Sequence, residues 1–176
     1  MFTKYVSNPT PAFLAPQSYE ERPDFVRKLF DSASNRKVWL WVGFYGIQPL
    51  DPATDKPISR QRFFNSHRAQ AIQAITLGII YHLDVITGIA RISVEQLAQQ
   101  CGLSTKSGAI TRASRAVVTL EQYGLLKCEK ERGREGARAQ KRIEITPLFI
   151  DMCGVNPKEF VLAQVAAKDA IKVGVL

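Results

Sequence analysis

Basic and hydroxyl-bearing side chains recur along the segment 107–120, whose sequence is SGAITRASRAVVTL and which contains no acidic residue. Four of them stand out by their spacing: Thr111, Arg112, Arg115 and Thr119. The apolar positions between them lie three or four residues apart, as on the buried face of a helix: Ile110, Ala113, Val117 and Leu120. The polar side chains are therefore expected to face outward. Such a helix fits a DNA major groove, where an arginine can donate two hydrogen bonds to a guanine edge.

A cationic hairpin, which we name the wing, is expected after this helix. The charged segment EKERGREGARAQK joins two expected strands, 125–128 and 142–146, and its two glycines permit the chain to reverse. Arginines on the wing could straddle a DNA backbone or reach the adjacent minor groove, where the negative potential is enhanced.

The sequence therefore predicts two groups of DNA contacts. The first lies in and just before a helix over 107–123, with Arg112 and Arg115 as the main base contacts: Thr105, Lys106, Ser107, Thr111, Arg112, Arg115 and Thr119. The second lies on the wing: Arg132, Arg134, Arg138 and Lys141. If about five of these bases each neutralise one phosphate, log affinity falls against log salt with a slope of about −4.5.

A solvated surface is the alternative for each group. Arg112 and Arg115 could only make the helix soluble, and the wing bases alternate with glutamates, as in a plain exposed hairpin. Three arginines further upstream could touch phosphates or only face water: Arg60, Arg62 and Arg68. The charge distribution favours DNA, because residues 104–142 carry ten lysines and arginines against four acidic residues, or +6 of the net +8.

The elements that position these residues give the fold class. In order, we expect a long helix over about 60–83, a turn over 84–88, a short strand over 89–92, a helix over 93–102, the helix over 107–123 and the wing. Ser93 and Gln96 can form a capping box, and Gly102 can end that helix. Ala98 lets the next helix pack across. This order is typical of a winged helix-turn-helix, which is mainly α with small β content (α+β).

The ends of the chain add further elements. Four prolines in residues 1–24 predict an extended arm, and a short helix follows over 23–32. We therefore assign 1–35 to an N-terminal arm with a short helix and 36–176 to the winged-helix domain. The aromatic segment 38–47 is expected to be a buried strand or, alternatively, a surface for self-association. Later helices should start at Pro147 and at Asn156-Pro157, the last running to about Lys172.

Other function classes find no support in the sequence. The three cysteines are odd in number and widely spaced, which fits neither disulfides nor a zinc site and favours a reducing cytoplasm. His67 and His82 match no ligand pair, and phosphate-loop and nucleophile-elbow motifs are missing. The longest apolar run is about half a membrane span. We therefore expect no enzymatic activity, no cofactor or metal, and no membrane association.

With these residues in view, the chain resembles the RepA replication initiators of IncFII-type plasmids. The resemblance covers most of the length, through the segments VSNPTPAF, RAQAIQAITLGIIYHLD, ISVEQLAQQCGLST and AITRASRAVVTLEQYGLL. The last segment is the most specific, because it contains the outward threonine and arginine positions. The resemblance implies an initiator of theta-type plasmid replication, which binds the plasmid origin as duplex DNA and helps to assemble host initiation and helicase-loading proteins.

Two questions stay open at this point. Family members usually continue into a long basic C-terminal region, whereas this chain stops at Leu176, as a trimmed form or a short variant would. Without the resemblance, the residues lead only to a winged-helix DNA binder. A transcriptional regulator at a promoter operator would carry the same residues, and so would a winged helix that binds proteins instead of DNA. The sequence leaves the DNA site and the formation of a homodimer undecided.

Overall fold

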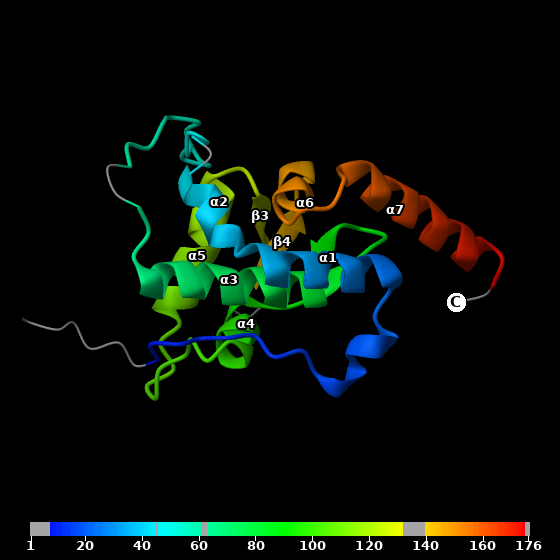
Figure 1. Cartoon of the computed structure of the whole chain (residues 1–176), viewed down its shortest axis with the longest axis horizontal. Helices are drawn as coiled ribbons and strands as arrows, with labels where there is room; N and C mark the ends of the chain where they lie inside the picture. The colour runs from blue at the N-terminus through cyan, green and yellow to red at the C-terminus, as the bar shows by residue number, and fades with distance from the viewer. Residues whose placement is uncertain (1–7, 45, 61–62, 132–139, 175–176) are drawn as a thin grey trace, which may run out of the picture.

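Helices dominate the fold, and a small antiparallel sheet packs against them (Figure 1). The structure is a computed structural model, and it describes residues 8–44, 46–60, 63–131 and 140–174. In chain order the elements are the 3-10 helix η1 (Gln17–Glu21), α1 (Asp24–Arg36), α2 (Val38–Phe44), α3 (Ser66–Tyr81), β1 (Leu83–Asp84), β2 (Ile89–Ala90), α4 (Val94–Gln100), α5 (Thr111–Gln122), β3 (Leu126–Glu131), β4 (Gln140–Ile145), α6 (Pro147–Met152) and α7 (Pro157–Lys172). The predicted α+β class is confirmed.

Helix α3 lies in the middle of the helices and contacts α1, α2, α4 and α5. Most residues from Ala69 to Tyr81 are buried, so the helix is apolar on all sides rather than along one stripe. It begins at Ser66, because the side chain of Asn65 accepts a hydrogen bond from the amide of Arg68 at 2.9 Å. The predicted start of this helix near residue 60 is wrong.

Helices α4 and α5 both pack against α3, and a tight turn joins them to each other. The predicted capping box is present, since the Ser93 hydroxyl and the Gln96 side chain each accept the other residue's amide at 3.1 Å. Gly102 follows α4 with a φ of +67°, which favours glycine. A side chain at Gly78 would lie 2.7 Å from Leu97, so glycine permits the close approach of α3 and α4.

The sheet has the strand order β1-β2-β4-β3, with every neighbouring pair antiparallel. Strands β3 and β4 pair from Leu126 with Ile145 to Glu131 with Gln140, which confirms the predicted hairpin and extends both of its strands toward the turn. Ile143 is fully buried, so one face of the hairpin belongs to the core. Strand β1 begins at Leu83, one residue before the segment 84–88 that the sequence predicts to be a turn.

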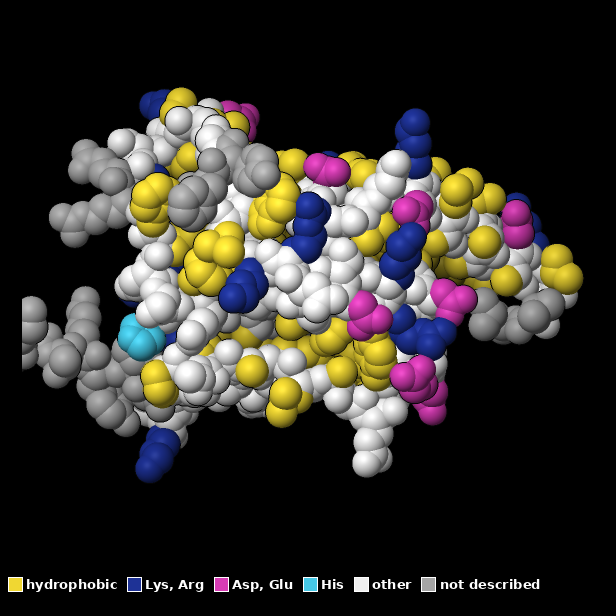
Figure 2. Space-filling view, viewed as in Figure 1, with side chains coloured by type: hydrophobic (Ala, Val, Ile, Leu, Met, Phe, Trp, Pro, Cys, Tyr) yellow, Lys and Arg dark blue, Asp and Glu magenta, His cyan; other side chains and the backbone are white. Residues whose placement is uncertain are grey.

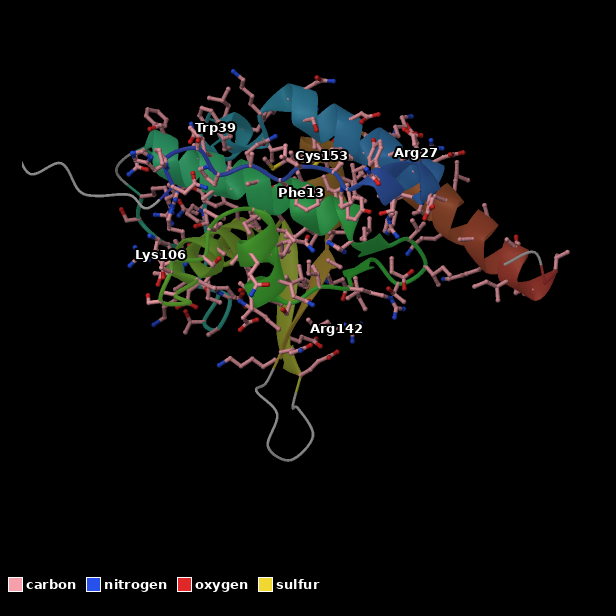
Figure 3. All side chains as sticks on the ribbon, turned by 90° about the horizontal axis from the view of Figure 1, so that it is seen from below. Phe13, Arg27, Trp39, Lys106, Arg142 and Cys153 are labelled. Atoms are coloured by element: carbon pink, nitrogen blue, oxygen red, sulfur yellow. The ribbon has the colours of Figure 1, made fainter. Side chains whose placement is uncertain are left out.

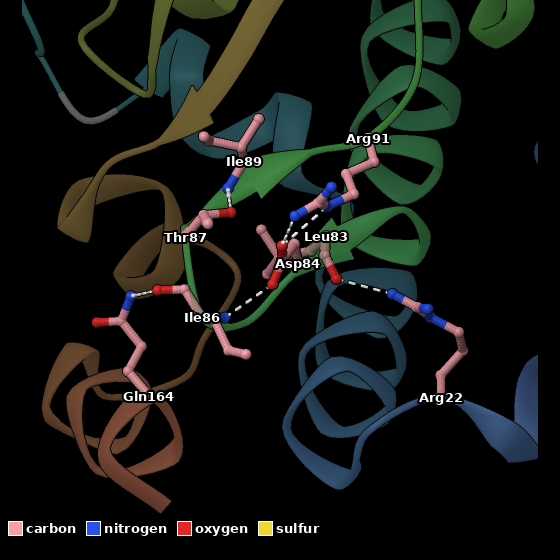
Figure 4. Close-up of polar contacts among 8 residues, drawn as sticks. All are labelled: Arg22, Leu83, Asp84, Ile86, Thr87, Ile89, Arg91 and Gln164. Carbon is pink, nitrogen blue, oxygen red and sulfur yellow. Dashed lines mark hydrogen bonds and ion pairs between the residues drawn. The ribbon is translucent and has the colours of Figure 1, made fainter. Parts of the chain in front are cut away.

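Asp84 holds the turn between β1 and β2 (Figure 4). Its carboxylate accepts hydrogen bonds from Nε of Arg91 at 2.8 Å and from the amide of Ile86 at 3.0 Å. Arg22 and Gln164 donate to backbone carbonyl oxygens of the same turn, at 2.7 and 3.1 Å. The small hairpin is therefore tied to the N-terminal arm and to α7.

The segment 38–47 is not the strand that its aromatic and branched residues predict. Residues Val38–Phe44 form α2, and Lys37 enters it in a left-handed conformation with a φ of 49°. The Gln73 side chain of α3 accepts a hydrogen bond from the amide of Val38 at 2.9 Å. Val38 and Val42, four residues apart, are buried against the core. A tertiary contact thus overrides local strand propensity.

The N-terminal arm packs onto the helices. Phe13 is 5% exposed, and its ring centroid lies 5.5 Å from that of Tyr81 and 6.0 Å from that of Phe30. One hydrophobic core therefore includes the arm, the helices and the sheet.

Helix α7 extends away from the body (Figure 1). Asn156 caps it by accepting from the amide of Lys158 at 3.0 Å, and Pro157 takes the first position, as the sequence predicts. Its large apolar side chains gather on the surface in Figure 2; four of them are half exposed or more: Val161, Leu162, Val165 and Ile171. In the described part of the chain, every helix is too short or too polar to cross a membrane.

Candidate nucleic-acid interface

The turn before α5 is organised by Thr105. The Thr105 hydroxyl accepts from the amide of Ala109 at 2.9 Å and lies 2.9 Å from the hydroxyl of Ser107. Its carbonyl oxygen accepts from the amide of Gly108, whose φ is +79°. This closed turn delays the start of α5 from the predicted Ser107 to Thr111. It also presents Lys106 and Ser107 to solvent (Figure 3).

The first turn of α5 has no side-chain cap. Ile110 occupies the N-cap position, and its side chain can make no hydrogen bond to the helix. Free amides and the positive end of the helix dipole attract anions such as phosphate. The exposed side chain of Thr111 lies in this first turn.

The apolar face of α5 is the one predicted. Ala113, Val117 and Leu120 are at most 1% exposed, and they pack into the core. Arg115 is exposed on the other side of the helix, as expected. Arg115 forms no ion pair with any residue in the described ranges.

Thr119 does not face outward as predicted. It is fully buried, and its hydroxyl donates to the carbonyl oxygen of Arg115 at 2.8 Å. The same hydroxyl accepts from Nη2 of Arg68 on α3 at 2.7 Å. The helical spacing placed Thr119 on the polar side, but α3 covers that position. Thr119 therefore links two helices and cannot contact DNA in this structure.

Arg112 is half-buried rather than free. Its Nη1 atom donates to the backbone carbonyl oxygen of Asn8 in the arm, and its Nη2 atom donates to that of His67 at 3.3 Å. Burial lowers the pKa of Arg112 from its ordinary value. The structure thus gives Arg112 a bridging position between the arm, α3 and α5, instead of the outward position expected from the sequence.

The wing residues divide into two sets. Arg132, Arg134 and Arg138 lie outside the described residues. Lys141 on β4 is partly buried, and its Nζ atom lies 3.0 Å from a carboxylate oxygen of Glu121 on α5. Lys141 is therefore committed to an ion pair within the protein. Arg142, at the next position of β4, is half-buried and pairs with Glu129 of β3 (Figure 3).

Two of the three arginines that the sequence left undecided lie beside α5, and the third, Arg62, lies outside the described residues. The guanidinium carbon of Arg60 lies 4.2 Å from the ring centroid of Phe64, and that of Arg68 lies 5.2 Å from the same ring. Arg60 also lies 5.7 Å from the ring centroid of Tyr123. The four-residue spacing of Arg60, Phe64 and Arg68 is visible in the sequence. Their contacts with α5 depend on tertiary packing, which the sequence spacing does not predict.

The cysteines are free, and the structure gives them no reactive environment. Burial raises the pKa of the Cys101 and Cys153 thiols to about 12, and that of Cys128 to about 11. Within the described residues, no group of three or more His, Cys, Asp and Glu side chains could hold a metal ion.

Comparison with known proteins gives one consistent result. The model of the IncFII RepA protein family matches residues 1–172. A "Probable replication-associated protein repA1" of Buchnera aphidicola subsp. Schizaphis graminum is 36% identical over 166 residues, which cover 91% of this chain and 59% of the relative. A "Probable replication-associated protein repA2" of Buchnera aphidicola subsp. Acyrthosiphon pisum is 32% identical over 88% of this chain and 64% of its own length.

A third relative carries a more general name. A "Replication initiation protein" of Escherichia coli is 31% identical over 139 residues, which cover 74% of this chain and 45% of the relative. No solved structure matches the chain significantly. The chain spans about three fifths of the length of the first of these relatives. The match over residues 1–172 nevertheless includes every helix and strand described above, and the chain belongs to the IncFII RepA protein family.

Proposed function

We propose that the protein is a sequence-specific duplex-DNA-binding protein that acts at a plasmid origin to initiate replication. The observation that carries this proposal is the acid-free first half of α5, which exposes Thr111 and Arg115 behind a helix start without a side-chain cap. The membership of a RepA family and a relative named as a replication initiation protein support the role in replication.

The fold interpretation that goes with this proposal is a winged helix. In this interpretation α3, α4 and α5 are its three helices, α5 enters the major groove, and the β3–β4 hairpin is the wing. Residues 36–176 would form the DNA-binding domain, with 1–35 as an arm packed on it. The order of the elements and the antiparallel sheet support this interpretation.

The contacts we propose are fewer than the sequence predicts. Arg115 and Thr111 read base edges, while Lys106, Ser107 and the amides at the start of α5 hold phosphates. Thr105 shapes the turn. Three arginines of the wing hold the DNA backbone: Arg132, Arg134 and Arg138. Thr119, Arg112 and Lys141 already have partners within the protein, and we propose that they position the contacting residues.

The partners of the complete initiator are part of the proposal as well. We propose that the protein brings host initiation and helicase-loading proteins to the origin, as its resemblance to the RepA initiators implies. The proposal needs neither a catalytic step nor a cofactor, because binding in a groove depends on hydrogen bonds and charge alone.

Selection of bound duplexes from a random pool, followed by footprinting of the selected site in its plasmid, tests the function. We expect recovery of one sequence, protection of repeated copies of it at the origin, and a stoichiometry of one or two chains per site. Protection of a single promoter palindrome would support a transcriptional regulator instead. Binding that shows no sequence preference and no salt dependence would contradict both.

A further inference from the structure

Two arginines lie together beside α5. Arg60 precedes α3, and Arg68 lies in its first turn. Both contact the ring of Phe64, with guanidinium carbons 4.2 and 5.2 Å from its centroid. The ring of Tyr123 lies next to that of Phe64, with 6.2 Å between the two centroids.

Within the described residues, no acidic side chain pairs with the charges of this cluster. Arg60 and Arg68 form no ion pair with the residues that the structure describes, whereas Arg27, Arg91 and Lys141 each contact a carboxylate. Burial lowers the pKa of Arg68, and the neighbouring charges of Arg60 and Arg115 lower it further. Like charges held together without an acid repel one another, and an external anion would relieve that repulsion.

The cluster is also fixed in place before any ligand arrives. Nη2 of Arg68 donates to the Thr119 hydroxyl at 2.7 Å, which ties its guanidinium to α5. Arg60 is held over two aromatic rings, at 4.2 and 5.7 Å from their centroids. Guanidinium groups stack on aromatic faces while their N–H groups stay available at the edge. Less side-chain freedom is then lost when an anion binds.

We propose that Arg60 and Arg68 together bind one phosphate of the DNA backbone, beside the groove that α5 enters. A guanidinium presents paired N–H donors that match phosphate oxygens, and two of them hold a single phosphate more completely than two lysines would. This inference rests on the proposed function, because it requires duplex DNA against α5. It adds a phosphate contact from α3 that fixes the angle of α5 in the groove.

Salt-dependent binding of the selected duplex by the complete 176-residue protein tests this inference. The variants are Arg60→Gln and Arg68→Gln, and the matched control is Lys168→Gln, which removes one positive charge from an exposed position on α7. We expect each arginine variant to bind about tenfold more weakly, on selected and scrambled duplexes alike. The slope of log affinity against log salt should flatten by about 0.9, the value for one phosphate. Lys168→Gln should behave as the unchanged protein.

Two further measurements distinguish one shared phosphate from two independent phosphate contacts and from a purely structural role of the arginines. The double variant should flatten the slope by no more than about 0.9, whereas two independent phosphate contacts would flatten it by about 1.8. One methylphosphonate at the bound position of the duplex should abolish the difference between the unchanged protein and Arg60→Gln. Arg60→Lys keeps the charge but loses the paired donors, so it should bind more weakly while keeping the salt slope of the unchanged protein. A slope flattened by about 0.9 in Arg60→Lys as well would assign Arg60 a purely structural role and overturn the inference.

The outcomes distinguish the inference from the function beneath it. If the unchanged protein binds duplex DNA and both arginine variants bind as well as Lys168→Gln, the phosphate site is wrong and the proposed function stands. If the unchanged protein shows no salt-dependent affinity for any duplex, the proposed function fails and the phosphate site fails with it.

Discussion

The guanidinium of Arg112 on α5 donates a hydrogen bond to the backbone carbonyl oxygen of Asn8, which lies 104 residues earlier in the chain. The Asn8 side-chain amide in turn donates to the carbonyl oxygen of Gly102 at 2.9 Å. The arm is thus fastened at both the end of α4 and the start of α5. This contact makes Arg112 a stabilising residue before any ligand is present.

Replacing Arg112 should therefore weaken the free protein. We expect Arg112→Ala to lower the free energy of unfolding by about 1 to 2 kcal/mol, because two backbone carbonyl groups lose a charged donor at a partly exposed site. Urea denaturation without DNA measures this loss. The control is Arg115→Ala, which removes an exposed arginine of the same helix and should change the stability little. Equal stabilities for the two variants would show that the arm contact contributes nothing.

The Asp84 turn should make stability depend on pH in the acid range. Burial by itself would raise the pKa of Asp84, but hydrogen bonds from Arg91, from the amide of Ile86 and from Thr87 lower it below its ordinary value of 3.8. A lowered pKa in the folded state stabilises the fold above pH 3.8, and this contribution is lost as the pH falls through the folded-state value.

Asp84→Asn is the corresponding variant. We expect it to be less stable than the unchanged protein by about 1 to 2 kcal/mol at neutral pH, since the ion pair with Arg91 is lost. The difference should be constant above about pH 5 and shrink below about pH 4. Thermal unfolding of both proteins, from neutral pH to about pH 3, measures this difference. A difference that grows on acidification would have the wrong sign for this account.

The three thiols should be nearly inert in the folded protein. Their raised pKa values leave very little thiolate at about pH 8, and the thiolate is the reactive species. We expect a disulfide reagent that reports thiolate by colour to react slowly with the folded protein and quickly after denaturation. Cys128 should react first, because it is the least buried of the three. Rapid reaction of Cys153 in the folded state would contradict the burial of its side chain.

Lys141 and Glu121 should stabilise the fold as a coupled ion pair, and Lys141 should not contact DNA. A double-mutant cycle with Lys141→Gln and Glu121→Gln should give a coupling energy of about 0.5 to 1 kcal/mol, because both side chains are partly shielded from water. Additive stabilities would show that the pair contributes nothing. Lys141→Gln should also change the salt slope of DNA binding by much less than about 0.9, the value for one lost phosphate contact.

Local signals predicted the parts of the fold that local chemistry decides. The Ser93–Gln96 capping box and the Asn156-Pro157 helix start were identified because each needs only residues a few positions apart. The residue types of segment 38–47 favour a strand. Val38–Phe44 nevertheless form α2, because the side chain of Gln73 on α3 accepts a hydrogen bond from the amide of Val38.

The candidate site shows the same division. Helical spacing correctly placed Ala113 and Val117 inside and Arg115 outside. It failed at Thr119, whose partner Arg68 lies 51 residues away, and at Arg112, whose partners Asn8 and His67 lie 104 and 45 residues away. Polar residues at the border of a helix face can turn toward a neighbouring element, and a periodic pattern carries no information about that neighbour.

The central claim is that α5 reads duplex DNA through Arg115. The most direct measurement compares the affinities of the unchanged protein and of Arg115→Ala for the selected duplex and for a scrambled duplex of equal length, at one salt concentration. The account expects Arg115→Ala to lose about 1 to 3 kcal/mol on the selected duplex beyond any loss on the scrambled one, with relaxed preference at one base pair. Equal losses on both duplexes would contradict it.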